Sequence, residues 1–132
     1  MASELRASRT NDRPLLLLAE EDAGLRRSLQ LLLRSRGYNV HAYASGTALL
    51  ADEEANTACC VVADYHLEGL SGIEILARLR RRGWSGPAVL LTPYCTADIR
   101  ERADAQGFAH VLEKPIRDYT LGNAVARLTG RA

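Results

Sequence analysis

Four of the short apolar runs in this sequence are followed by side chains that can do chemistry. They are Glu20, Glu21 and Asp22 after the run at 15–19, Asp64 after the run at 59–63, Thr92 after the run at 88–91, and Lys114 just after the run at 110–112. If these runs are parallel strands, their carboxyl ends meet at one edge of the sheet, where such sheets bind ligands. The sequence therefore predicts a site of carboxylates, a hydroxyl and an ammonium group.

Phosphoryl transfer to a carboxylate is the chemistry that this set of groups fits. A carboxylate that attacks phosphorus must overcome repulsion between anions, and a hard cation such as Mg²⁺, held by neighbouring carboxylates, reduces that repulsion. A lysine adds a compact positive charge, and a threonine hydroxyl can donate to a phosphoryl oxygen. The expected product is an acyl phosphate on Asp64.

Lys114 is the only lysine in the chain, and the other sixteen of its 17 basic residues are arginines. Because a lysine ammonium acts as a point charge and an arginine as a planar fork, the exception indicates a specific role at this position.

The elements that must position these residues alternate along the chain. Strands are expected at 15–19, 38–43, 59–63, 88–91 and 110–112, and helices at 23–36, 46–55, 72–82 and 96–106, with a last helix that carries Leu121, Val125 and Leu128. Ser45 is expected to cap the helix at 46–55, and Ile73, Leu76 and Leu79 to face inward from the helix at 72–82. Continuous apolar strands that alternate with helices indicate a parallel sheet covered on both faces.

Composition limits the classes of protein that fit. The 132 residues are 47% hydrophobic, which is enough for one domain with a core, expected at 14–130 after a disordered leader at 1–13. A net charge of +1 gives no electrostatic reason to expect nucleic acid or an anionic membrane as a partner. The run at 15–19 is too short to span a bilayer and lacks the flanks of a secretory signal, so we expect a cytoplasmic protein without membrane association.

The cysteines, Cys59, Cys60 and Cys95, are odd in number and have no metal-ligand spacing. We therefore expect free thiols rather than disulfides or a zinc site.

Four segments in order resemble the receiver domain of bacterial two-component response regulators: LLLLAEEDAGLRRSLQLLLRSRGYNV, VVADYHLEGLSGIEIL, AVLLT and HVLEKPI. The resemblance covers about residues 14–128. It implies a flavodoxin-like, doubly wound five-stranded parallel sheet of order 2-1-3-4-5 with helices on both faces. It also implies a cis peptide bond before Pro115.

The resemblance implies a role for each site residue. Asp64 becomes the phosphoacceptor, Thr92 the switch hydroxyl and Lys114 the lysine of the site. Mg²⁺ would be held by Glu20, Glu21, Asp64 and the backbone carbonyl of His66. His66 and Tyr94 also occupy positions that tune dephosphorylation in this family, or they are rim residues.

The implied function is a phosphorylation switch of a two-component system or phosphorelay rather than an enzyme, catalysing at most its own phosphorylation and dephosphorylation. The implied partners are a histidine kinase or histidine phosphotransfer protein and a downstream protein, with no DNA-binding domain in this chain, and the protein is expected to be a monomer or weak dimer.

Four positions depart from the family pattern. Glu21 replaces the usual aspartate, Glu68 the usual proline, and Val111 the usual aromatic residue. Pro93 has no N–H for a phosphoryl group, where the family prefers a small residue. These changes predict weaker Mg²⁺ binding and altered switching, and they leave open a second function: a degenerate pseudo-receiver that binds proteins independently of phosphorylation.

A third function is a small hydrolase with an aspartate nucleophile, like the haloacid-dehalogenase-like phosphatases. Those enzymes resemble one another in a D-x-D motif, whereas in this sequence His66 stands at the position of the second aspartate.

Overall fold

The computed structural model describes residues 12–131, and the expected leader lies outside the described residues except for Asp12 and Arg13. Five parallel strands form one sheet in the order β2-β1-β3-β4-β5, so the predicted fold class and strand order are confirmed. The strands are β1 Leu15–Ala19, β2 Asn39–Tyr43, β3 Cys60–Asp64, β4 Ala88–Thr92 and β5 His110–Glu113.

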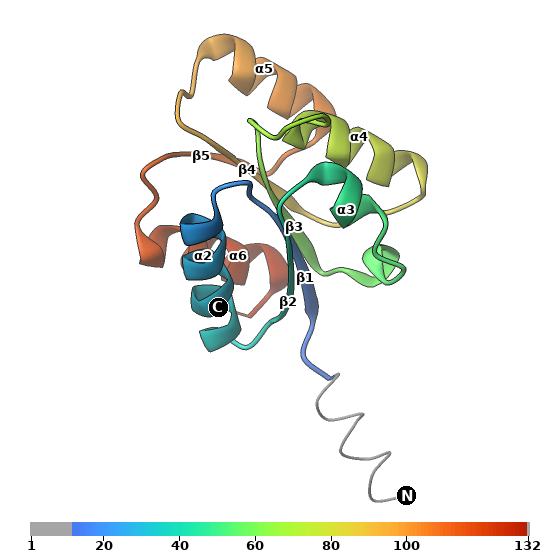
Figure 1. Cartoon of the computed structure of the whole chain (residues 1–132), viewed down its shortest axis with the longest axis vertical. Helices are drawn as coiled ribbons and strands as arrows, with labels where there is room; N and C mark the ends of the chain where they lie inside the picture. The colour runs from blue at the N-terminus through green and yellow to red at the C-terminus, as the bar shows by residue number, and fades with distance from the viewer. Residues whose placement is uncertain (1–11, 132) are drawn as a thin grey trace, which may run out of the picture.

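Helices cover both faces of the sheet (Figure 1). Helices α2 and α6 lie on one face, and α3, α4 and α5 lie on the other. Their bounds are α2 Ala23–Ser35, α3 Gly46–Leu50, α4 Gly72–Arg81, α5 Ala97–Gln106 and α6 Asp118–Thr129, with a short 3₁₀ helix, η1, at Ala55–Thr57. No helix in the described part of the chain is long and apolar enough to cross a membrane.

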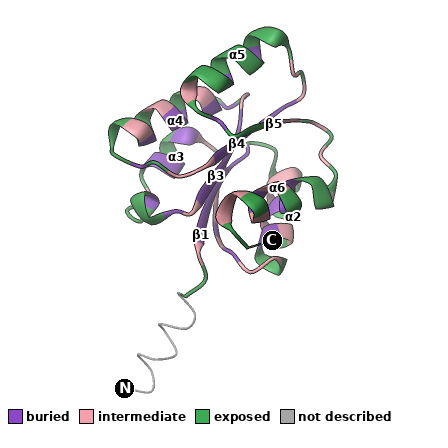
Figure 2. Ribbon diagram, turned by 180° about the vertical axis from the view of Figure 1, so that it is seen from behind, coloured by how far each residue is buried: buried purple, intermediate pink, exposed green. Residues whose placement is uncertain are grey.

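The central strands carry continuous apolar runs because helices cover both faces of the sheet, as the sequence predicts. Alternate residues of β1 point to opposite faces, so Leu15 and Leu17 join the core beneath α3 and α4 while Leu16 and Leu18 join the core beneath α2 and α6. Figure 2 shows the result: the central strands are buried, and exposed residues gather on the outer sides of the helices.

The helix ends follow the local sequence. Side chains of Asp22, Ser45, Ser71 and Thr96 cap four helices by accepting a hydrogen bond from a backbone N–H of the first turn. Gly107 ends α5 with a φ of 99°, a conformation that an L-residue with a side chain rarely adopts.

One detail of the prediction is wrong. The helix expected at 46–55 ends at Leu50, because the carboxylate of Asp52 accepts hydrogen bonds from Glu54 N–H and from the Tyr43 side chain of β2 instead of continuing the helix. In α4, Leu76 and Leu79 are fully buried as expected, and Ile73 is half-buried and packs against the same core. Ile75, which the sequence analysis did not single out, is also fully buried.

Candidate functional site

Asp64 ends β3, the central strand of the sheet, and is 2% exposed. Its neighbours at the same edge are Glu20, directly after β1, and Thr92, the last residue of β4, and both are buried. The carboxyl ends of three adjacent strands thus bring together three of the residues that the sequence singled out.

Lys114 reaches this edge from the segment that follows β5. Its Nζ lies 2.7 Å from Asp64 Oδ2 and 2.7 Å from Glu20 Oε1, so one ammonium group contacts both carboxylates. A hydrogen bond from Lys114 N–H to Thr92 O holds the segment beside β4, and the peptide bond before Pro115 is cis. Burial by itself lowers the pKa of Lys114, but its contacts with Asp64 and Glu20 outweigh burial and raise it, so the ammonium form is stabilised.

Glu20 is fully buried at the edge of the site. Burial raises the pKa of Glu20, and the Asp64 carboxylate adds to the rise; contacts with Lys114 and with Asp22 N–H oppose it without cancelling it. Glu20 Oε1 forms an ion pair with Lys114 Nζ at 2.7 Å, and Glu20 Oε2 accepts a hydrogen bond from Asp22 N–H at 3.0 Å. Because the same ammonium group also contacts Asp64, one positive charge serves two carboxylates.

Glu21 does not join this buried group. It is exposed, and among the described residues no group of three ligand atoms within 4.8 Å of one another contains Glu20, Glu21 or Asp64. Asp22 instead caps α2 through Gly24 N–H, as the sequence predicts. The acidic run therefore divides into a buried carboxylate, an exposed one and a helix cap.

Thr92 turns its hydroxyl into the loop that follows it. The Oγ1 atom accepts a hydrogen bond from Tyr94 N–H and donates one to Tyr94 O, both at 3.2 Å. Pro93 lies between them and offers no N–H of its own. Tyr94 itself is 68% exposed, so this loop carries an aromatic ring at the surface beside the site.

The loop after β3 contacts Asp64 through its backbone. His66 N–H donates to Asp64 Oδ1 at 3.1 Å, while Lys114 occupies Oδ2. The imidazole of His66 packs edge-to-face on Tyr65, with ring centroids 4.9 Å apart, and His66 is exposed. The structure thus brings His66 to the site by its N–H, and its carbonyl remains a predicted metal ligand.

Sequence reasoning missed two residues that position the site. Arg26 of α2 donates from a guanidinium nitrogen to Glu20 O at 2.9 Å, which holds the chain as it leaves β1. A Cβ at Gly72 would lie 2.7 Å from Asp64 O, so this glycine lets α4 begin against the end of β3. The glycine after the loop was a recognisable signal, whereas nothing distinguishes Arg26 from the other arginines of the sequence.

Val111 and Glu68 have unremarkable surroundings. Val111 is half-buried and packs against the core beneath α3, α4 and α5, and Glu68 is exposed in the loop after β3. Val111 thus stands where the family resemblance implies an aromatic ring, and Glu68 where it implies a rigid proline.

The residues fit a hard divalent cation. The donor set consists of carboxylate oxygens, which Mg²⁺ prefers together with several retained waters. Two buried carboxylates share one ammonium group, so a second positive charge at this edge would be favourable.

Comparison with known sequences identifies a family for nearly the whole chain. Residues 16–126 match the family described as Response regulator receiver domain. Nodulation protein W of Bradyrhizobium diazoefficiens is 33% identical over 117 residues, covering 89% of this chain and 52% of that protein. The transcriptional regulatory protein FixJ of Azorhizobium caulinodans is 32% identical over 119 residues, covering 90% of this chain and 56% of that protein. The chain therefore spans about half the length of these relatives.

Solved structures share the fold. A CheY-like response regulator receiver domain protein from Methanospirillum hungatei superposes with a TM-score of 0.83 at 19% identity, covering 89% of this chain and 94% of that chain. The chemotaxis protein CheY4 of Vibrio cholerae gives a TM-score of 0.82 at 21% identity, covering 88% and 98%.

Proposed function

This chain belongs to the response regulator receiver domain family, and from that premise we propose that it is a phosphorylation switch whose phosphoacceptor is Asp64. The observation that carries the proposal is the double contact of Lys114 Nζ, at 2.7 Å from both Asp64 and Glu20 at the edge of the sheet. One buried carboxylate of this pair lies at the end of the central strand, with an ammonium group already beside it. Such an arrangement suits a nucleophile that must receive an anion.

In the proposed reaction an Asp64 carboxylate oxygen forms a new O–P bond while the P–N bond to a donor histidine breaks and the leaving imidazole is protonated. The donor is a phosphohistidine of a histidine kinase or phosphotransfer protein in the cytoplasm. Lys114 then exchanges its contact with Asp64 Oδ2 for the phosphoryl group, and His66 N–H keeps the remaining carboxyl oxygen oriented.

Mg²⁺, when bound, would supply positive charge against the phosphoryl oxygens. Glu20, Asp64 and the backbone carbonyl of His66 are the proposed ligands, with Glu21 as an outer carboxylate. Because Glu21 is exposed and one methylene longer than the usual aspartate, we propose that Mg²⁺ binds weakly.

Thr92 is the proposed residue through which phosphorylation changes the conformation of the loop after β4. Its hydroxyl currently bonds to both backbone groups of Tyr94, and donation to a phosphoryl oxygen requires release of Tyr94 O. The hydrogen bond from Cys95 N–H to Glu113, at 2.8 Å, ties the same loop to the end of β5. A change at Thr92 would therefore move the exposed ring of Tyr94 toward or away from a downstream protein.

The test is phosphorylation of the purified chain by a small phosphodonor with Mg²⁺, followed by intact mass. Wild type is expected to gain one phosphoryl group, and Asp64→Asn none, because an amide is not a nucleophile toward phosphorus. A gain of the same mass by Asp64→Asn, or no gain by wild type under conditions that phosphorylate another receiver domain, would exclude Asp64 as acceptor.

The second candidate function is a pseudo-receiver that binds proteins without phosphorylation. Pro93 without an N–H, the half-buried Val111 and the exposed Glu21 favour it. A Mg²⁺ titration followed by the amide signals of Asp64 and His66 separates the two functions. Shifts that saturate at millimolar Mg²⁺ support the switch, whereas unchanged signals support the pseudo-receiver.

A further inference from the structure

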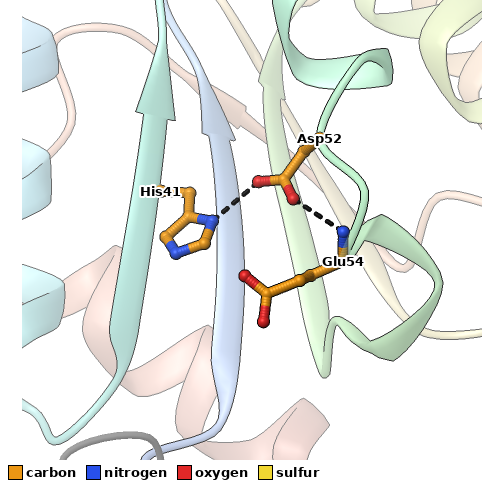
Figure 3. A group of neighbouring side chains, drawn as sticks. All are labelled: His41, Asp52 and Glu54. Carbon is orange, nitrogen blue, oxygen red and sulfur yellow. Dashed lines mark hydrogen bonds and ion pairs between the residues drawn. The ribbon is translucent and has the colours of Figure 1, made fainter.

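A second group of metal-ligating side chains lies on the opposite edge of the sheet from β5, where β2 meets the loop after α3. One nitrogen of His41 and one carboxylate oxygen each of Asp52 and Glu54 all lie within 4.8 Å of one another. Figure 3 shows His41 projecting from β2 toward the two carboxylates, which come from the loop between α3 and η1. No other set of three such groups this close together occurs within residues 12–131, and the proposed phosphoryl transfer uses none of the three.

Asp52 is the buried centre of this group, with 6% of its side chain exposed. Oδ2 lies 2.6 Å from His41 Nδ1 and accepts a hydrogen bond from the Tyr43 hydroxyl, while Oδ1 accepts from Glu54 N–H at 2.8 Å. Both oxygens of Asp52 are therefore acceptors in contacts whose donor is fixed, the Tyr43 hydroxyl at Oδ2 and the Glu54 N–H at Oδ1.

The hydrogen bonds of Asp52 determine the tautomer that we assign to His41. Because Oδ2 already accepts from the Tyr43 hydroxyl and Oδ1 from Glu54 N–H, the proton of the His41–Asp52 contact is placed on His41 Nδ1, which leaves the lone pair of the neutral ring on Nε2. A histidine that donates one ring N–H to a carboxylate and presents its other nitrogen is the usual arrangement of a metal-binding histidine.

Access and space are available beside the free nitrogen. His41 and Glu54 line a cavity of about 440 Å³ together with Asp12, Arg13, Asn39 and Thr57. Glu54 is exposed, and its side chain makes no hydrogen bond with the described residues, so the carboxylate is free to move. Asp12 adds a negative charge to the cavity and Arg13 a positive one, so the lining as a whole does not repel a cation.

We propose that His41 and Glu54 bind a divalent transition-metal ion of the Zn²⁺ class, with Asp52 as the positioning residue that orients the imidazole. Imidazole nitrogen together with carboxylate oxygen suits Zn²⁺, Co²⁺ or Ni²⁺, whereas Mg²⁺ prefers oxygen ligands alone. Ligand atoms at about 2.1 Å from a tetrahedral Zn²⁺ lie about 3.5 Å apart. The exposed Glu54 carboxylate is free to approach the imidazole to that spacing, and waters from the cavity complete the coordination.

The competing explanation is that the His41–Asp52 pair only fastens the loop after α3 to β2. That explanation gives no role to Glu54, whose side chain contributes nothing to the fastening. A variant of Glu54 therefore distinguishes metal binding from structural support.

The experiment is a titration of the metal-free chain with Co²⁺, read by visible absorption, followed by competition with Zn²⁺ in a calorimeter. One equivalent is expected to bind to wild type and equally to Asp64→Asn, in which the phosphoacceptor site is altered. Glu54→Gln and His41→Ala are expected to weaken binding at least about tenfold, and Asp52→Asn by a similar factor through loss of orientation. Glu53→Gln and His110→Ala, which alter an adjacent exposed carboxylate and an exposed histidine, should leave binding unchanged.

Three results would overturn the proposal. Unchanged affinity in Glu54→Gln would do so, and this variant keeps every described hydrogen bond of the loop, so it is expected to fold. Loss of the bound equivalent in Asp64→Asn would assign the ion to the phosphoacceptor site. A Co²⁺ spectrum with thiolate charge-transfer bands, abolished by Cys95→Ser, would assign it to a cysteine.

Discussion

Two carboxylates with little-exposed side chains, Asp64 and Asp52, each pair with a nitrogen-bearing side chain, and their surroundings differ. Asp64 Oδ2 lies 2.7 Å from Lys114 Nζ with 3% of its side chain exposed, and Asp52 Oδ2 lies 2.6 Å from His41 Nδ1 with 6% exposed. The distances and burial are nearly equal. The difference lies in the other groups that surround each carboxylate.

Around Asp64 the negative charge is in excess. Glu20 shares Lys114 with it, so two carboxylates face one ammonium group. Around Asp52 both oxygens are satisfied by neutral donors and by His41, and Asp52 is held in one orientation. The comparison teaches that burial and one short contact do not define a carboxylate's environment: excess negative charge remains around Asp64, whereas the bonds to Asp52 fix its orientation.

Tyr43 contacts both regions. Its hydroxyl donates to Asp52, and its backbone carbonyl accepts from Glu20 N–H at 3.0 Å. The two regions are therefore neighbours through one residue of β2, and each variant below is best measured in both.

Removing the shared cation should have the largest effect. In Lys114→Ala, two buried carboxylates remain without a counter-charge, and loss of one partner from a buried ion pair costs about 3 kcal/mol or more of unfolding free energy. Urea denaturation at neutral pH measures the loss, and Mg²⁺ should restore part of it by supplying positive charge. A loss below about 0.5 kcal/mol would mean that Lys114 contributes little to neutralising this edge.

Lys114→Arg is the matched control for that loss. It keeps the charge, so the fold should persist, but a planar guanidinium cannot replace the point charge between Glu20 and Asp64. We expect phosphoryl uptake to fall well below that of wild type in the intact-mass assay. Undiminished uptake would contradict the role assigned to the ammonium group.

Neutralising Asp52 should lower the free energy of unfolding by less than Lys114→Ala does. Asp52→Asn removes the charge that His41 and Tyr43 bond to, and loss of charge-assisted hydrogen bonds is expected to lower the free energy of unfolding by about 1–2 kcal/mol. Phosphoryl uptake at Asp64 should be nearly unchanged. Glu53→Gln, one residue along and exposed, is the control and should shift stability by less than about 0.5 kcal/mol.

Shortening the exposed carboxylate of Glu21 should raise the Mg²⁺ affinity of the site at Asp64. Glu21→Asp restores the residue type usual in the family, and an exposed charge contributes up to about 1 kcal/mol, which corresponds to a rise in Mg²⁺ affinity of at most about fivefold. The amide shifts of Asp64 and His66 report the binding. Glu101→Asp, exposed on α5, serves as the control, and weaker binding by Glu21→Asp would show that the longer side chain is the better ligand here.

In the Cys60 thiol, burial shifts the pKa without a contribution from an opposite charge. Burial raises the pKa of this thiol to about 12 from 9.0, the adjacent Cys59 adds to the rise, and the backbone of Val61 only slightly opposes it. Since the folded protein then holds the proton more tightly than the unfolded chain, its contribution to stability is present below pH 9 and is lost as pH rises toward 12. At pH 9.5 the loss is below about 1 kcal/mol.

The comparison of Cys60→Ala with Cys95→Ala measures this small effect. The alkaline fall in unfolding free energy should be shallower in Cys60→Ala than in wild type, whereas Cys95→Ala, in a half-exposed loop position, should follow wild type. Identical alkaline slopes in wild type and Cys60→Ala would show that other groups cause the fall.

The sequence alone was sufficient for the architecture and for the centre of the candidate site. Uninterrupted apolar runs such as Leu15–Ala19 arise only where a strand is covered on both faces, and that requirement predicts a parallel sheet between helices. Once the runs are parallel strands, Glu20, Asp64 and Thr92 must meet at one edge, and the lysine after the last strand lies near them. Strand geometry carries this information, so no knowledge of packing was needed.

Only the tertiary structure decided how the side chains at that edge are used. Glu20 and Glu21 are adjacent in sequence and alike in chemistry, but one is fully buried against Lys114 and the other is exposed. The Thr92 hydroxyl likewise bonds within its own loop. The sequence did not indicate the pairing of His41 with Asp52, because Asp52 lies in a loop at positions where we expected the helix at 46–55 to continue. Periodicity reports which face a residue occupies, whereas its partner depends on which segments the fold brings together in space.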